Sequence, residues 1–137
     1  MNTHYLATIG RIIIGLFFLA AGASKIGGPA PAEQVVRMLE AGVPAPELMF
    51  ALAAACETTA GLCFILGLHV RLVSLLLFAF TVLVSILLHA FWTFTGEERT
   101  VQMIMFLKNI ALSGGLLAFA GFGPGKLSLD HWFGKGD

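Results

Sequence analysis

The chain has 137 residues, of which 58% are hydrophobic and only 12% are charged, and its formal net charge is zero. Soluble domains carry about 25% charged residues, so this composition leaves too little polar surface to cover a globule in water. It favours an integral membrane protein of one domain, residues 1–137, and the zero net charge excludes nucleic acid as an electrostatic partner.

Four apolar stretches are long enough to cross a bilayer as helices: residues 6–24, 47–68, 71–92 and 102–122. A transmembrane helix needs about 20 such residues, and backbone groups in lipid need partners within their own segment, which favours helices over strands. Ala21 and Ala23 resemble a signal-peptide cleavage site, but this stretch is long and contains Arg11, so we expect it to remain. The sequence therefore predicts an all-α membrane protein, a bundle of four transmembrane helices.

The connections between these stretches differ in length. The second and third stretches are separated only by a turn near His69, which predicts a tight antiparallel hairpin. The longest connection, residues 25–46, contains prolines on both sides of a short helical pattern over residues 33–41. Its apolar and charged residues fall on opposite sides: Val35, Val36 and Leu39 against Glu33, Arg37 and Glu40. We expect an amphipathic helix in the membrane interface, acting either as a lid or as a surface connector.

With four crossings, both termini lie on the same side of the membrane. Basic residues are almost evenly divided between the two sides, so the positive-inside rule decides little. If Arg11 is counted with the side of the termini, that side has more basic residues than the other, so we expect both termini in the cytoplasm.

Three ionisable residues, Arg11, Glu57 and Lys108, fall inside the apolar stretches. An isolated charge at bilayer depth costs at least about 2.5 kcal/mol, so mutual pairing is expected. At a rise of about 1.5 Å per residue, Glu57 lies within about 7 Å in depth of both cations. We expect Lys108 to face Glu57, with Arg11 also in reach and Asn109 adding hydrogen-bonding capacity.

Helical spacing places these charges on faces rich in small or polar residues, which are expected to pack inward. The four faces are Arg11, Gly15, Phe18, Gly22 and Lys25; Ala53, Glu57, Ala60, Gly61 and Phe64; Arg71, Ser74, Thr81, Ser85 and His89; and Lys108, Ala111, Gly115 and Ala118.

Two interpretations of the charged cluster remain open. In the structural one, Arg11, Glu57 and Lys108 form a buried ionic clasp that sets helix register. In the functional one, the group lines a cavity for an anionic or quinone-like head, since cations outnumber anions and intramembrane ionisable residues mark functional sites. The candidate site comprises Arg11, Lys25, Glu57, His89, Lys108 and Asn109.

Other residues of chemical interest point to no further site. Cys56 and Cys63 lie about 10 Å apart along one helix, too far for a disulfide, and are interpreted as buried apolar residues. The histidines are dispersed, so no metal or haem site is predicted: His4, His69, His89 and His131. Trp92 and Trp132 are expected at the interface, and Asp130 is expected to bind backbone groups in the turn that follows it.

The order of these features resembles the DoxX family of small bacterial four-helix membrane proteins. The resemblance covers nearly the whole chain: Arg11 with Gly15, "AAGASKIGG", a "GVPAP" loop, Glu57 with "GLCFILGLHVR", then "FLKN", "SGGLL" and "GPGKLSLD". It implies an inner-membrane location and places Glu57, Lys108 and Asn109 at the family's polar helix positions. The family takes its name from a relative of a membrane subunit of an archaeal thiosulfate:quinone oxidoreductase, and other members have been linked to membrane redox complexes.

Two functional hypotheses follow. The first is a quinone- or small-molecule-binding component of a membrane redox system, with a redox partner protein and a quinone as the ligand to test. The second is a non-enzymatic scaffold or small-solute permease-like module with a structural ion cluster. No motif of catalysis is present, and the sequence leaves enzymatic activity and self-association into a homo-oligomer open.

Overall fold

The computed structural model describes residues 3–27 and 31–134, with side chains from residue 5 onward, so the side chain of His4 lies outside the described residues. The elements follow in the order α1 (Thr3–Gly27), α2 (Pro31–Glu40), α3 (Pro46–Leu66), α4 (Val70–Leu88), the short 3₁₀ helix η1 (Phe91–Thr93), α5 (Gly96–Phe122) and α6 (Leu129–Trp132). Within this part of the chain, four segments are long and apolar enough to cross a membrane: α1, α3, α4 extended through η1, and α5. The predicted all-α fold with four transmembrane helices is confirmed, and α2 confirms the helix in the first loop.

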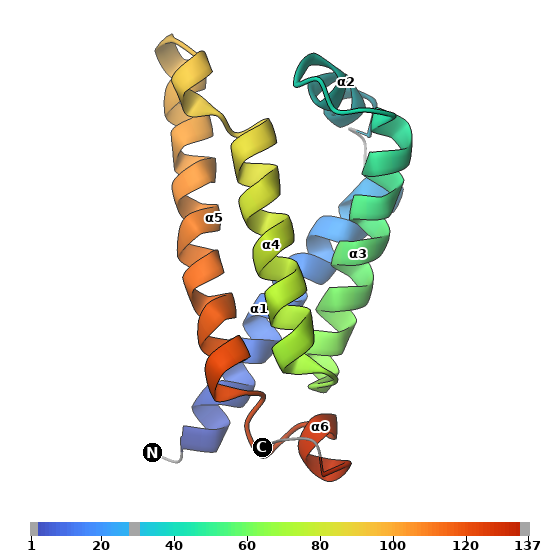
Figure 1. Ribbon diagram of the computed structural model, residues 1–137, viewed down its shortest axis with the longest axis vertical. Helices are drawn as coiled ribbons and strands as arrows, with labels where there is room; N and C mark the ends of the chain where they lie inside the picture. The colour runs from blue at the N-terminus through green and yellow to red at the C-terminus, as the bar shows by residue number, and fades with distance from the viewer. Residues whose placement is uncertain (1–2, 28–30, 135–137) are drawn as a thin grey trace.

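The four long helices pack mainly as two pairs, α1 with α3 and α4 with α5. Figure 1 shows α3 and α4 diverging from their shared turn toward the end at which α2 lies. We call residues 67–69 and 123–134 the terminal end, and residues 31–46 and 89–98 the loop end. The pair α1–α3 therefore lies close to the pair α4–α5 at the terminal end, and the two pairs are apart at the loop end.

Glycines bring α1 and α3 into close contact. A Cβ atom on Gly61 would lie 2.6 Å from the backbone nitrogen of Leu19, and one on Gly22 would lie 2.9 Å from the carbonyl oxygen of Ala54. Small residues allow such an approach because no side chain separates the two backbones. The inward faces predicted for the first two transmembrane helices are confirmed in these buried residues: Arg11, Gly15, Phe18, Gly22, Glu57, Ala60, Gly61 and Phe64.

The other pair follows the prediction on α4 but not on α5. Ser74, Thr81 and Ser85 of α4 are buried, as the polar stripe predicted, whereas Arg71 at its start is exposed. On α5 the buried residues are Gln102, Asn109, Ser113 and Leu116, whereas Lys108, Ala111 and Ala118 are exposed. Adjacent residues lie about 100° apart around a helix, so a shift of one position moves the inward face from Lys108 to Asn109.

At the terminal end, Arg11 joins three segments of the chain. Its side chain is buried, and its guanidinium donates from Nη1 to the carbonyl oxygen of Phe64 at 3.0 Å and from Nη2 to that of Leu127 at 2.7 Å. Leu127 precedes α6, so the side chain attaches the C-terminal segment to α1 and to the end of α3. The expectation that Arg11 pairs with Glu57 is wrong, because backbone carbonyls are its partners.

Asp130 completes the terminal end. Its carboxylate accepts hydrogen bonds from the backbone N–H groups of His69 at 2.7 Å and Val70 at 2.8 Å, and its own N–H donates to Gly67. A carboxylate at this position satisfies the free N–H groups and the positive end of α4. Asp130 thus binds the turn between α3 and α4, not the turn that follows it, which corrects the sequence-based expectation.

Gly67 is required by this arrangement. Its φ of 72° lies in the left-handed region, where it ends α3, and a Cβ atom on it would collide with the guanidinium of Arg11 and the side chain of Ser128. The terminal end is therefore closed by contacts that leave no room for a side chain at this turn.

Candidate ligand cavity

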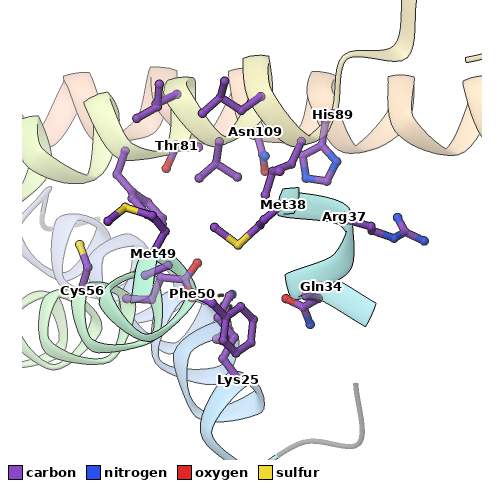
Figure 2. A pocket seen from close by; sticks show the side chains of 18 of the residues that line it. Lys25, Gln34, Arg37, Met38, Met49, Phe50, Cys56, Thr81, His89 and Asn109 are labelled. Atoms are coloured by element: carbon purple, nitrogen blue, oxygen red, sulfur yellow. Dashed lines mark hydrogen bonds and ion pairs between the residues drawn. The ribbon is translucent and has the colours of Figure 1, made fainter. Parts of the chain in front are cut away.

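The divergence of the two helix pairs leaves a cavity of about 670 Å³ that opens toward the loop end. Figure 2 shows side chains of α1, α2, α3, α4 and α5 around it. Most of its wall is apolar, including Phe17, Phe18, Phe50 and Leu112. Sites for small molecules have about this volume and are apolar with a few converging polar groups.

The carboxylate of Glu57 is already paired inside this cavity. Lys25 Nζ lies 2.6 Å from Glu57 Oε2 and also donates to the carbonyl oxygen of Ala21 at 3.4 Å. Both side chains are largely buried, with 16% of Lys25 and 10% of Glu57 exposed. The pair joins the end of α1 to the middle of α3, so each charge is neutralised where lipid would not solvate it.

Lys108 does not pair with Glu57, and that prediction is wrong. Its ammonium lies 5.4 Å from the centre of the Phe17 ring and 3.5 Å from Met105 Sδ. The residue is exposed, yet it contributes to the edge of the cavity between α5 and α1. Lys108 faces outward because the neighbouring Asn109 occupies the inward position on α5.

Two buried polar side chains face the cavity without a protein partner. Asn109 is 7% exposed, and its amide makes no hydrogen bond to any residue the structure describes. Thr81 is 4% exposed, and its Oγ1 likewise has no partner among the described residues. Both line the cavity, and Figure 2 shows them on the same wall as His89. Burying the Thr81 hydroxyl without a partner costs about 1–3 kcal/mol, and the amide of Asn109 has no protein partner among the described residues, so the two suit a polar ligand atom.

A hydrogen-bond chain holds His89 at the mouth of the cavity. His89 Nδ1 lies 2.7 Å from Gln102 Oε1, and Gln102 Nε2 donates to Glu98 Oε1 at 2.6 Å. Gln102 is buried, whereas Glu98 is exposed and reaches Arg37 of α2 at 3.8 Å. The chain therefore connects the cavity wall, through α5, to the helix that covers the loop end.

Helix α2 partly covers the mouth. Met38 is its buried residue, and Figure 2 shows it between the two walls of the cavity. The predicted apolar residues Val36 and Leu39 are 50% and 63% exposed, as suits a helix lying in the membrane interface. Met38 therefore lies at the cavity, whereas Val36 and Leu39 face away from it.

Comparisons with known proteins place the chain in a family. The family model of DoxX matches residues 6–90. The chain belongs to the DoxX family. It is 33% identical over 126 residues to the inner membrane protein YphA of Escherichia coli K12, covering 92% of this chain and 89% of the relative. It is also 33% identical over 127 residues to the inner membrane protein YqjF of the same organism, covering 93% and 91%. No solved structure matches the chain.

In this DoxX protein, five of the six candidate residues line the cavity: Lys25, Glu57, His89, Lys108 and Asn109. Arg11 instead belongs to the terminal end. The sequence analysis placed Thr81 on the polar stripe without assigning it a role, and it missed Gln102 and Glu98. Gln102 repeats the spacing of the buried face of α5, seven positions before Asn109, and this periodicity is the signal that identifies it.

The remaining reactive groups of the DoxX protein are two free thiols. Cys56 and Cys63 are half-buried and unpaired, and Cys56 lines the cavity whereas Cys63 packs near the core cluster around Phe64. Within residues 3–27 and 31–134, no three His, Cys, Asp or Glu side chains are grouped so as to hold a metal ion.

Proposed function

We propose that this integral membrane protein binds a small amphipathic molecule of the quinone class in the cavity at its loop end. The protein would act in the bacterial inner membrane, with both termini in the cytoplasm, as one component of a redox system. The observation that carries the proposal is the pair of buried, unpartnered side chains, Asn109 and Thr81, in an apolar cavity of about 670 Å³.

A quinone matches this lining in shape and polarity. Its ring is flat and apolar and fits between aromatic residues such as Phe18 and Phe50, which lie in opposite helices of the first pair. Its carbonyl oxygens accept hydrogen bonds, and the amide of Asn109 and the hydroxyl of Thr81 are donors. The divergence of the helix pairs, next to the lipid, provides room for an alkyl tail.

A binding function of this kind requires a partner for electron transfer. The inner membrane names of the relatives in Escherichia coli support the location, and the resemblance to membrane redox subunits supports the partner. The partner would supply or remove the electrons, while this protein would hold the lipid-soluble reactant at the interface. Whether copies of the chain associate is a separate question from this binding.

The proposal is tested by thermal unfolding of the detergent-purified protein with and without decylbenzoquinone. A ligand at a hundredfold excess over its Kd stabilises the folded state by about 2.7 kcal/mol. We expect a rise in Tm that is lost in Asn109→Leu and Thr81→Val. Ser113→Ala is the matched control, because Ser113 is also buried and unpartnered but does not line the cavity. An unchanged Tm with decylbenzoquinone and other quinones would count against the proposal.

The alternative function is a scaffold or small-solute permease-like module in which the ion cluster is structural. The existing pair between Lys25 and Glu57 at 2.6 Å favours it, since neither charge needs a ligand. It predicts that the double variant Lys25→Met with Glu57→Gln folds as well as the wild type and that quinones stabilise neither protein. Quinone stabilisation of both proteins would exclude this alternative.

A further inference from the structure

The hydrogen-bond chain at the cavity mouth determines which nitrogen of His89 carries the proton. A carboxylate only accepts hydrogen bonds, so the group of Gln102 that contacts Glu98 must be its amide nitrogen. The carbonyl oxygen Oε1 of Gln102 is then the atom facing His89, at 2.7 Å from Nδ1. Because a carbonyl oxygen also only accepts, Nδ1 must be the donor. In the neutral imidazole, Nε2 is therefore a hydrogen-bond acceptor.

This acceptor is available on the cavity side. No described residue makes a hydrogen bond to Nε2, and His89 itself lines the cavity. Figure 2 shows His89 and Asn109 on the same wall of the cavity. α4 and α5 are neighbours, and both His89, the residue that follows α4, and Asn109 of α5 line the cavity. Asn109 contributes a buried amide without a partner, which donates and accepts.

We infer that the ligand is recognised through a hydroxyl group that donates a hydrogen bond to His89 Nε2, so that the site prefers a hydroquinone to a quinone. This inference rests on the proposed function and names the redox form that the site takes. A hydroquinone has O–H groups for His89 and for the carbonyl of Asn109. A quinone has only hydrogen-bond acceptors, so its carbonyl oxygens would be repelled by the acceptor Nε2. A methyl ether has nearly the shape of the hydroquinone but no O–H donor.

The contribution of Glu98 and Gln102 is to position His89, since neither has to touch the ligand. Gln102 is 2% exposed and holds the ring through Nδ1, while Glu98 holds the amide in one orientation. Loss of this support would leave the ring in place but would permit the other tautomer, with Nε2 as a donor. Selectivity for the reduced ligand would then fall, with little change in total affinity.

The test is calorimetric titration of the whole chain in lipid nanodiscs with three probes: decylhydroquinone, decylbenzoquinone and the dimethyl ether of decylhydroquinone. Empty nanodiscs correct for partition into lipid, and anaerobic conditions keep the hydroquinone reduced. One hydrogen bond in a buried site is worth roughly a tenfold change in affinity. We expect wild-type protein to bind decylhydroquinone about tenfold more tightly than either of the other two probes.

Variants separate this inference from the proposed function. His89→Phe retains a ring but has no acceptor, and it should lose most of the preference for decylhydroquinone. Gln102→Leu should reduce the preference several-fold while the protein still binds. Equal binding of decylhydroquinone and its ether by wild-type protein would overturn the inference and leave the proposed function intact. Binding of none of the probes would overturn both. If His89→Phe does not fold, the wild-type comparison of hydroquinone and ether still decides the question.

Discussion

The two ends of the bundle treat buried polar groups in opposite ways. At the terminal end, Arg11 binds two backbone carbonyls and Asp130 binds two backbone N–H groups, so the turn between α3 and α4 is fixed from both sides. At the loop end, Asn109 and Thr81 are also buried, but neither they nor His89 Nε2 have a hydrogen-bond partner in the part of the chain that the structure describes. At the terminal end the buried polar groups therefore join separate segments, although Arg11 Nε has no partner within the described residues, whereas at the loop end they border the cavity.

This difference indicates which ionisable residues hold the fold together. A buried polar group bonded to backbone atoms of distant segments acts as a structural link, as Arg11 does between residues 64 and 127. A buried polar group without a partner weakens the fold, and a ligand can complete its bonding only where the group lines a cavity, as Thr81 does and Ser113 does not. Lys25 and Glu57 are intermediate, because they line the cavity but already satisfy each other.

The largest expected effect lies at the terminal end. Arg11→Met removes the link between α1, α3 and the C-terminal segment and leaves two carbonyls without their donor. We expect the free energy of unfolding to fall by about 3–6 kcal/mol, because two hydrogen bonds from a charged donor are lost and each is worth about 1.5–3 kcal/mol. Equilibrium unfolding in mixed micelles measures this loss, and ligand binding by the folded fraction should be unchanged. A loss below about 1 kcal/mol would contradict the structural role of Arg11.

A smaller effect is expected for the ion pair in the cavity. Lys25→Met leaves the carboxylate of Glu57 buried without its partner, which should cost about 1–3 kcal/mol. The double variant with Glu57→Gln should recover most of this loss, because no lone charge remains. A double-mutant cycle in the same unfolding experiment gives the coupling energy, and strictly additive losses would show that the two residues are not a pair.

Thr81→Val is expected to stabilise the protein. Valine has nearly the shape of threonine but no hydroxyl, so a buried group without a partner is removed at a gain of about 1 kcal/mol. Ser113→Ala tests the same effect outside the cavity. The comparison becomes sharper if both variants are stabilised but only Thr81→Val loses affinity for decylhydroquinone. A destabilised Thr81→Val would mean that the hydroxyl has a partner in the folded protein.

The smallest effect is expected for Lys108. Its side chain is exposed, and within the described residues its ammonium interacts with the Phe17 ring and Met105 Sδ, so Lys108→Met should change stability by less than about 1 kcal/mol. The effects of Lys108→Met and Glu57→Gln should add, since the residues are not in contact. A coupling energy above about 1 kcal/mol would mean that Lys108 and Glu57 interact, as the sequence predicted.

The sequence was sufficient for the helices and for one of the two helix pairs. Long apolar stretches define α1, α3, α4 and α5, and the glycines of α1 and α3 mark a real contact because two backbones touch there. On α5 the same reasoning failed, since Ala111 and Ala118 are exposed and a Cβ atom on Gly115 would meet only the end of the Ile14 side chain. Small residues allow close packing but do not require it.

Partners of the charged residues were harder to predict, because depth alone does not select among them. Lys25 lies near the end of α1, yet its long side chain extends to Glu57 at the middle of α3. Arg11 bonds to backbone carbonyls, which every residue has, so no sequence pattern marks its partners at 64 and 127. The hydrogen bond between His89 and Gln102 depends on how α4 and α5 align across η1, which residue periodicity does not specify.

The most direct test of an open, ligand-binding loop end uses the two cysteines of α3. Both are half-buried and unpaired, but only Cys56 lines the cavity. Alkylation of the protein in nanodiscs by N-ethylmaleimide is followed at each thiol by mass spectrometry, with and without saturating decylhydroquinone. A filled cavity predicts that modification of Cys56 slows several-fold while Cys63 is unaffected. Unchanged modification of Cys56, or an equal slowing at both thiols, would contradict a ligand site between the helix pairs.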